Sequence, residues 1–123
     1  KAIGAYSVGI KGRHFIFVSG QLGIDPVTGA MVEGGVEAET RQALTNLKGV
    51  LEAVGCDLSA VVKTTVFLRD INEFGSMNTV YSEFFQEDPP ARSAFQVAAL
   101  PKGAAVEIEA IAMAANGDCN CKE

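Results

Sequence analysis

One apolar stripe constrains the fold of this chain more than any other feature of its sequence. Within residues 36–54, Leu44, Leu47, Leu51 and Val54 recur at intervals of three and four. An α-helix has 3.6 residues per turn, so this spacing gathers the apolar side chains on one side of a helix. We therefore predict a helix over 36–54 that lies on a flat apolar surface and keeps its other side in water.

A second helix and a set of strands complete the expected secondary structure. The second helix is predicted over 73–85, with Asp70 or Asn72 capping its start. Dense β-branched and aromatic residues predict strands, at 6–10, 14–20, 61–68, 93–98 and 105–113. The order ββ-α-β-α-ββ predicts an α+β fold, a two-layer sandwich with both helices on one face of the sheet. We expect the first two strands to form a hairpin and the last two to form another.

The last predicted strand assigns its side chains to two different faces. Val106, Ile108 and Ala110 share the face expected to meet the helices, whereas Glu107 and Glu109 share the other. The second face also carries apolar residues, here Phe67 and Ile111. A helix-free face of this kind is expected to be buried against other subunits, and closure into a ring would achieve this symmetrically.

Length and charge limit the class of protein. The 123 residues suit one domain, predicted at 1–115 with a polar tail at 116–123. The net charge of −5 argues against a nucleic-acid-binding module, and no apolar run approaches the length of a membrane span. Three cysteines do not make a disulfide framework, so we expect a reducing compartment: the cytoplasm, with a mitochondrion or related organelle as the alternative. The Cys119 and Cys121 pair is interpreted as part of the tail rather than as a metal site.

Two charged residues are the candidates for chemistry. Arg92 opens an apolar strand, and its guanidinium offers two parallel charge-assisted hydrogen bonds to a carboxylate. Glu107 lies between Val106 and Ile108, and it could act as a general base if desolvation raised its pKa. The residues alone leave alternatives open: a structural ion pair with a nearby acid for Arg92, and for Glu107 a solvated position or a pairing with Lys63 or Arg69.

Other polar residues are weaker candidates. Asn78 falls on the apolar stripe of the second helix and should therefore be hydrogen-bonded, either to a loop or in a pocket. Tyr6 and Ser19 flank the first hairpin and carry hydroxyl groups. His14 has no partners for a catalytic triad, and Cys56 is interpreted as a small packed residue.

Several spaced motifs together resemble one known family over residues 2–114. They are Ala2-Ile3-Gly4-Ala5-Tyr6-Ser7, Val18-Ser19-Gly20-Gln21-Leu22-Gly23, Val62-Lys63-Thr64-Thr65-Val66-Phe67-Leu68, Asn78-Thr79-Val80-Tyr81, Pro90-Ala91-Arg92-Ser93 and Val106-Glu107-Ile108-Glu109. These segments closely resemble the Rid family, the reactive intermediate deaminases, also called YjgF.

The resemblance implies a fold and an activity. The fold is chorismate-mutase-like, with a mixed sheet, and three chains form a homotrimer with an inner β-barrel and active sites between subunits. The activity is hydrolysis of 2-imino acids and their enamine tautomers, such as 2-aminoacrylate and 2-aminocrotonate, which leave pyridoxal-phosphate-dependent dehydratases. The products are 2-oxo acids and ammonia, and neither a cofactor nor a metal is implied.

The resemblance also implies residue roles. Arg92 would bind the substrate carboxylate, and Glu107 would activate the attacking water. The substrate-binding residues would be Tyr6, Ser19, Gly20, Asn78, Arg92 and Ala94. Two departures stand out: many members carry Cys at the position of Ala94, and the connection over 86–90 is shorter than usual. The alternatives are a non-catalytic trimer that binds small carboxylates or acts as a chaperone, and a ribonuclease or translation inhibitor.

Overall fold

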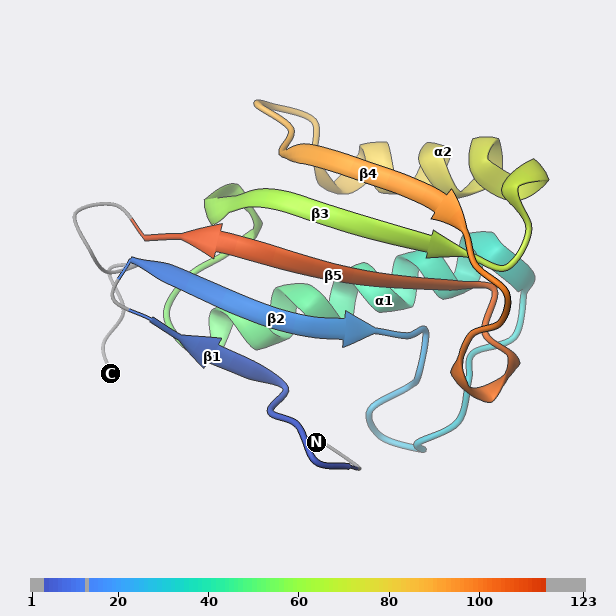
Figure 1. Cartoon of the computed structure of the whole chain (residues 1–123), viewed down its shortest axis with the longest axis horizontal. Helices are drawn as coiled ribbons and strands as arrows, with labels where there is room; N and C mark the ends of the chain where they lie inside the picture. Colours follow the sequence, from blue (N-terminus) through green and yellow to red (C-terminus); the bar gives the residue numbers. More distant parts are fainter. Residues whose placement is uncertain (1–3, 13, 115–123) are drawn as a thin grey trace.

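A computed structural model describes residues 4–12 and 14–114 of the chain. Within them, strands β1 to β5 and helices α1 and α2 follow the expected order (Figure 1). Their bounds are β1 Gly9–Lys11, β2 Phe15–Gln21, α1 Gly35–Glu52, β3 Val61–Leu68, α2 Phe74–Phe84, β4 Ala91–Gln96 and β5 Val106–Met113. Single turns of 3-10 helix at Leu58–Ala60, Ile71–Glu73 and Pro101–Gly103 precede β3, α2 and β5 respectively.

The strands form one mixed sheet in the order β1-β2-β5-β3-β4. β3 and β4 are parallel, and every other neighbouring pair is antiparallel. Both helices lie behind the sheet in Figure 1, so the other face carries no helix. The predicted two-layer α+β sandwich and the predicted hairpin of β1 and β2 are therefore confirmed, although the hairpin turn includes Arg13, which lies outside the described residues.

The predicted hairpin of the last two strands is wrong. β3 lies between β4 and β5, and β4 runs parallel to β3. A parallel neighbour requires a long crossover connection, which α2 supplies between β3 and β4. The segment after β4 then crosses the end of β3 to reach β5, through a turn in which Lys102 adopts a positive φ of 57°.

The core lies between the helices and the sheet. The stripe residues Leu44, Leu47 and Leu51 are fully buried, and they pack with Val66 of β3 and Ile108 of β5. Truncating one such leucine to alanine typically costs about 2–5 kcal/mol of folding free energy. This packing fixes which face of each strand points toward the helices.

The cap that the sequence predicted for the second helix lies one turn earlier, because the N-cap of α2 itself, Glu73, makes no side-chain capping hydrogen bond. The Asp70 carboxylate accepts a hydrogen bond from the backbone N–H of Asn72 at 3.0 Å, which caps the 3-10 turn leading into the helix. Met77, Tyr81 and Phe85 of the expected stripe are buried. The helix therefore presents one side to the sheet, and Asn78 lies next to that side.

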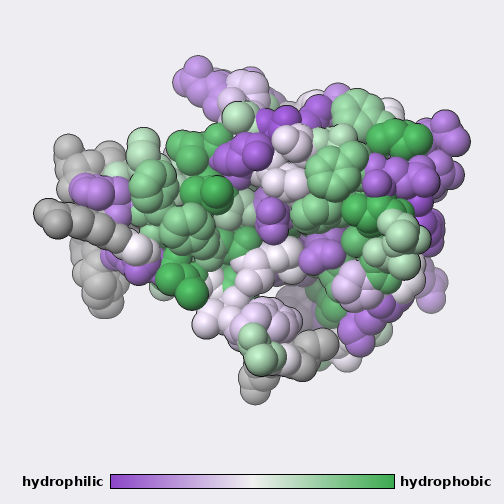
Figure 2. Space-filling model, in the orientation of Figure 1, coloured by the Kyte–Doolittle hydropathy of each residue, from purple (hydrophilic) through white to green (hydrophobic). Residues whose placement is uncertain are grey.

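The helix-free face is apolar, as predicted. Phe15, Phe17, Phe95 and Met113 are each 41–47% exposed. Figure 2 views this face and shows apolar residues spread across it, with polar residues between them. Exposed apolar residues gathered on one face are typical of surfaces that bind other protein chains.

Three further observations concern expected features of the chain. Cys56 packs partly against the core, as interpreted, but it is disulfide-bonded; the other cysteines, Cys119 and Cys121, lie outside the described residues together with the rest of the tail. No helix in the described part of the chain is long and apolar enough to cross a bilayer. Within 4–12 and 14–114, no group of three histidine, cysteine or acidic residues is placed to hold a metal ion.

Candidate active site

Arg92 projects from the edge strand β4 toward helix α2. It lies beside Thr64 of β3 in the parallel register, and Thr64 is fully buried on the helix side of the sheet. The Nη1 atom of Arg92 donates a hydrogen bond to Oδ1 of Asn78 at 2.6 Å. Asn78 is therefore hydrogen-bonded, as the sequence predicted for a polar residue on this stripe, and its partner is the side chain of Arg92.

Two aromatic rings hold the guanidinium of Arg92. Its central carbon lies 4.6 Å from the ring centroid of Tyr81 and 5.2 Å from that of Phe74. The Tyr81 hydroxyl shares a hydrogen bond of 2.7 Å with the Thr64 hydroxyl, which fixes the ring. Burial raises the pKa of Tyr81, against the opposing effects of the Thr64 hydrogen bond and the Arg92 charge, so the ring stays neutral. We call Arg92, Asn78, Phe74, Tyr81 and Thr64 the arginine cluster.

The arginine cluster leaves most donors of Arg92 available. A guanidinium has five N–H donors, and Asn78 takes only one of them among the described residues. Cation–π contacts and the single hydrogen bond restrict the orientation of the group without using its fork. Ala94 lies two residues further along β4 and on the same side, opposite the buried Val66. A carboxylate bound by Arg92 would therefore lie near Ala94.

Glu107 lies on the opposite face of the sheet, across Gly20 of β2. A Cβ atom added to Gly20 would overlap Oε2 of Glu107 and would stand 2.7 Å from its carboxyl carbon. Gly20 is part of a bulge, because the register between β2 and β5 shifts between Val18 and Gln21. Because Gly20 has no side chain, the Glu107 carboxylate can lie directly against the Gly20 backbone.

The Glu107 carboxyl group has a pKa above that of an ordinary glutamate. Its pKa is raised, mainly because burial removes water from the charged form, and secondly because Glu109 adds a nearby negative charge. A carboxylate with a raised pKa is a better base at neutral pH than an ordinary surface carboxylate.

Ser19 lies next to Gly20 in β2, and Tyr6 lies in the segment that precedes β1. The Ser19 hydroxyl donates to the backbone oxygen of Ser7 at 2.6 Å, and the Ser19 backbone N–H donates to that of Val8 at 2.9 Å. Ser19 thus ties the segment before β1 to β2, while Tyr6 in that segment is 50% exposed. We call Glu107, Gly20 and Ser19 the carboxylate cluster.

The two clusters do not form one pocket within a single chain. Glu107 is paired with Phe67 of β3, whereas Arg92 is paired with Thr64 on the same strand. Positions 64 and 67 differ by an odd number, so their side chains point to opposite faces. Arg92 therefore cannot neutralise Glu107 of the same chain directly.

A cavity of about 360 Å³ opens on the helix-free face. Its polar lining consists of Ser7, Ser19, Lys63, Thr65 and Glu109. It includes one member of the carboxylate cluster but neither Arg92 nor Glu107, so it is not the complete site that the sequence predicts.

Comparisons with known proteins identify relatives of this chain. The sequence model described as endoribonuclease L-PSP matches residues 1–114. The chain belongs to this family, which is also called the Rid or YjgF family. A rat protein named 2-iminobutanoate/2-iminopropanoate deaminase is 57% identical over 112 residues, which make up 91% of this chain and 82% of that protein.

Solved structures of Rid proteins share the fold. RidA from the Antarctic bacterium Psychrobacter is 44% identical with a TM-score of 0.89, covering 93% of this chain and 92% of its own. Escherichia coli TdcF with bound serine is 40% identical with a TM-score of 0.87, covering 92% and 91%. The family resemblance noted in the sequence is confirmed.

The sequence did not single out three members of the arginine cluster. Phe74 and Tyr81 follow the apolar spacing of a core stripe, and Thr64 lies in an ordinary β-branched run. The one signal that could have found them is the polar Asn78 between the two aromatics, since Asn78 is four positions after Phe74 and three positions before Tyr81.

Replacing Gly20 with alanine is expected to lower the rate of 2-imino acid hydrolysis by about 10- to 100-fold, because the new methyl group must displace the Glu107 carboxylate. Affinity for a small carboxylate should change little, since Arg92 lies on the other face. Gly49→Ala is the matched control, because a Cβ at Gly49 in α1 meets no atom within 4 Å. Equal rates for both variants and the unaltered protein would contradict the assigned place of Glu107.

Proposed function

We propose that this protein hydrolyses 2-imino acids and their enamine tautomers, such as 2-aminoacrylate and 2-aminocrotonate, to 2-oxo acids and ammonia. The observation that carries the proposal is the desolvated carboxylate of Glu107, which lies across a glycine and has a raised pKa. The aromatic-bracketed Arg92 and the 57% identity to the rat deaminase support the same assignment.

The chemistry divides between the two clusters. Arg92 binds the substrate carboxylate through its available donors and so fixes the neighbouring imine carbon. Glu107 accepts a proton from water as the water oxygen bonds to that carbon and the C=N electron pair moves to nitrogen, and it passes this proton to the nitrogen. Glu107 then takes the proton of the new hydroxyl group and delivers it to the nitrogen as the C–N bond breaks, so ammonia leaves and a carbonyl forms.

This division requires two copies of the chain. Because the clusters face opposite sides of the sheet, the arginine cluster of one subunit has to meet the carboxylate cluster of another. The apolar helix-free face supports such an assembly. We propose a homotrimer with three sites of this kind between its subunits.

The other readings have less support. The family description names an endoribonuclease, but a net charge of −5 is unfavourable for binding a polyanion. A protein that only binds small carboxylates would need Arg92 but would have no use for the partly buried carboxylate of Glu107, with its raised pKa.

A coupled assay tests the proposal. A serine or threonine dehydratase generates the imine in situ, and semicarbazide competes for it, so a deaminase is expected to raise 2-oxo acid formation and suppress the semicarbazone. Titration calorimetry with 2-oxobutanoate measures binding separately. Binding without any acceleration of hydrolysis would replace the proposal with the carboxylate-binding reading, and cleavage of RNA under the same conditions would favour the ribonuclease.

A further inference from the structure

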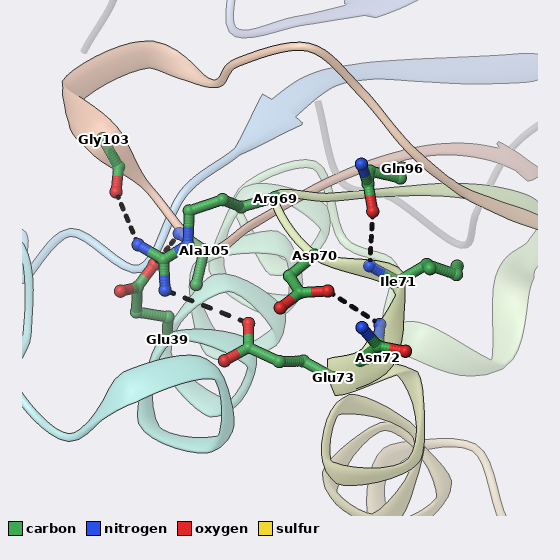
Figure 3. A network of polar contacts seen from close by, with 9 residues as sticks. All are labelled: Glu39, Arg69, Asp70, Ile71, Asn72, Glu73, Gln96, Gly103 and Ala105. Carbon is green, nitrogen blue, oxygen red and sulfur yellow. Dashed lines mark hydrogen bonds and ion pairs between the residues drawn. The ribbon is translucent and has the colours of Figure 1, made fainter.

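Glu39 of α1 makes a contact that links the helix layer to the start of β5, the strand that carries Glu107. Its side chain faces the sheet and is only 7% exposed. The Oε1 atom accepts a hydrogen bond of 2.7 Å from the backbone N–H of Ala105, which is itself fully buried (Figure 3). A buried amide without a partner is costly, so this contact determines where Ala105 lies.

Ala105 is held on both of its backbone groups. Its carbonyl oxygen accepts a hydrogen bond of 2.9 Å from the backbone N–H of Arg69. The Arg69 side chain also donates to the carbonyl oxygen of Gly103 at 3.3 Å, so the loop before β5 is attached to the end of β3 (Figure 3). Glu107 follows Ala105 by two residues, and the entry of β5 thus sets the position of the Glu107 backbone.

The backbone of Glu39 also limits the segment that follows β2. A Cβ atom at Gly23 would stand 2.6 Å from Cα of Glu39 and 2.8 Å from its carbonyl oxygen. Gly23 lies three residues after Gly20, on which the Glu107 carboxylate rests. One residue of α1 therefore contacts both chain segments that define the place of Glu107.

We propose that Glu39 is a positioning residue for Glu107. It fixes the start of β5 through Ala105 and packs on the β2 exit at Gly23, so that the Glu107 carboxylate meets the water that attacks the imine. This inference rests on the proposed deaminase function. It assigns no contact with substrate to Glu39, and it leaves carboxylate binding by Arg92 unaffected because β4 lies at the far edge of the sheet.

Three variants separate positioning from simple stabilisation. Glu39→Met keeps the size of the side chain and removes the acceptor, whereas Glu39→Gln keeps a carbonyl oxygen that can accept from Ala105. Thr40→Val is the matched control, because the Thr40 side chain is fully buried and its hydroxyl has no hydrogen-bond partner in the described part of the chain. Each full-length variant is compared for turnover in the dehydratase-coupled assay, for 2-oxobutanoate affinity and for thermal unfolding.

Glu39→Met is expected to lower turnover by about 10- to 100-fold, as a misplacement near 1 Å would, while the 2-oxobutanoate dissociation constant stays within about twofold. Glu39→Gln should restore most of the rate, and Thr40→Val should match the unaltered protein. If Glu39→Met does not fold, Glu39→Asp takes its place, since its carboxylate is one methylene shorter.

Two results would overturn the inference. Unchanged turnover in a folded Glu39→Met or Glu39→Asp variant would show that Glu39 only stabilises the fold, and so would equal losses of turnover and affinity. An unaltered protein that fails to hydrolyse imines would instead overturn the proposed function, so the two failures can be told apart.

Discussion

Replacing Arg92 with alanine is expected to lower kcat/KM for imine hydrolysis by about 100-fold or more and to weaken 2-oxobutanoate binding in parallel. Truncating one partner of a half-buried, hydrogen-bonded charge pair commonly costs about 2–5 kcal/mol. The loss should appear in both quantities, because the proposed role of Arg92 is to bind the carboxylate that substrate and product share. The coupled assay and titration calorimetry measure the two effects on the same preparation.

Two other substitutions sharpen the result for Arg92. Arg92→Lys keeps a positive charge but loses the planar fork and its stacking on Tyr81 and Phe74, so it should retain only part of the affinity. Arg41→Ala is the control, because Arg41 forms an exposed ion pair with Glu83 on the helix layer and belongs to neither cluster. Full turnover by Arg92→Ala, or a comparable loss in Arg41→Ala, would remove Arg92 from the site.

The proposed homotrimer with sites between subunits adds a distinctive expectation. Arg92→Ala and Glu107→Gln chains are each expected to be inactive alone, but every mixed trimer contains one site with both groups intact. Co-expression in equal amounts should therefore recover about a quarter of the unaltered activity, since about three quarters of random trimers are mixed and each has one working site of three. No recovery in trimers verified to be mixed would place both groups in the same chain's site.

The sequence determined the elements of the fold but not the neighbours of each strand. Apolar periodicity predicted α1 and α2 because the burial of one side of a helix is a local property of its residues. Strand order is not local: β4 and β5 follow each other in the chain, and the pattern of their side chains is satisfied equally well with or without β3 between them. The crossover through α2 decides the strand order, and the residues of β4 and β5 do not indicate which strand lies beside them.

The sequence predicted only those residues of the candidate site whose chemical character is unusual for their local surroundings. Arg92 and Glu107 were detectable because charges in apolar strands are unusual. Gly20 and Glu39 were harder to interpret: one acts through the absence of a side chain, and the other through a hydrogen bond to a residue 66 positions away. Contacts of that length depend on how the layers pack, which single-sequence patterns do not specify.

Replacing Glu107 with glutamine is expected to lower the rate of imine hydrolysis by about 100- to 10,000-fold while 2-oxobutanoate binding stays nearly unchanged. Glutamine keeps the shape of the side chain over Gly20 but cannot accept a proton from water. The split between rate and affinity distinguishes Glu107 from Arg92, whose loss affects both. A variant that keeps its rate would remove the general base from the mechanism.

The pH dependence follows from the raised pKa of Glu107. The base must be ionised, so activity should fall as the pH drops through a value above the ordinary 4.5. Glu109→Gln removes the second cause of the rise, and the acid limb should therefore move to lower pH in that variant; measuring both proteins in the same buffers cancels any titration of the substrate.

Stability has the opposite sign, because folding disfavours the ionised form of a group whose pKa it raises. Glu107→Gln should thus melt at a higher temperature than the unaltered protein near neutral pH, and the gain should disappear once the pH falls below about 4.5, where Glu107 is protonated in both the folded and unfolded chain. A variant with lower stability at neutral pH would mean that the carboxylate is stabilised rather than strained by its place over Gly20.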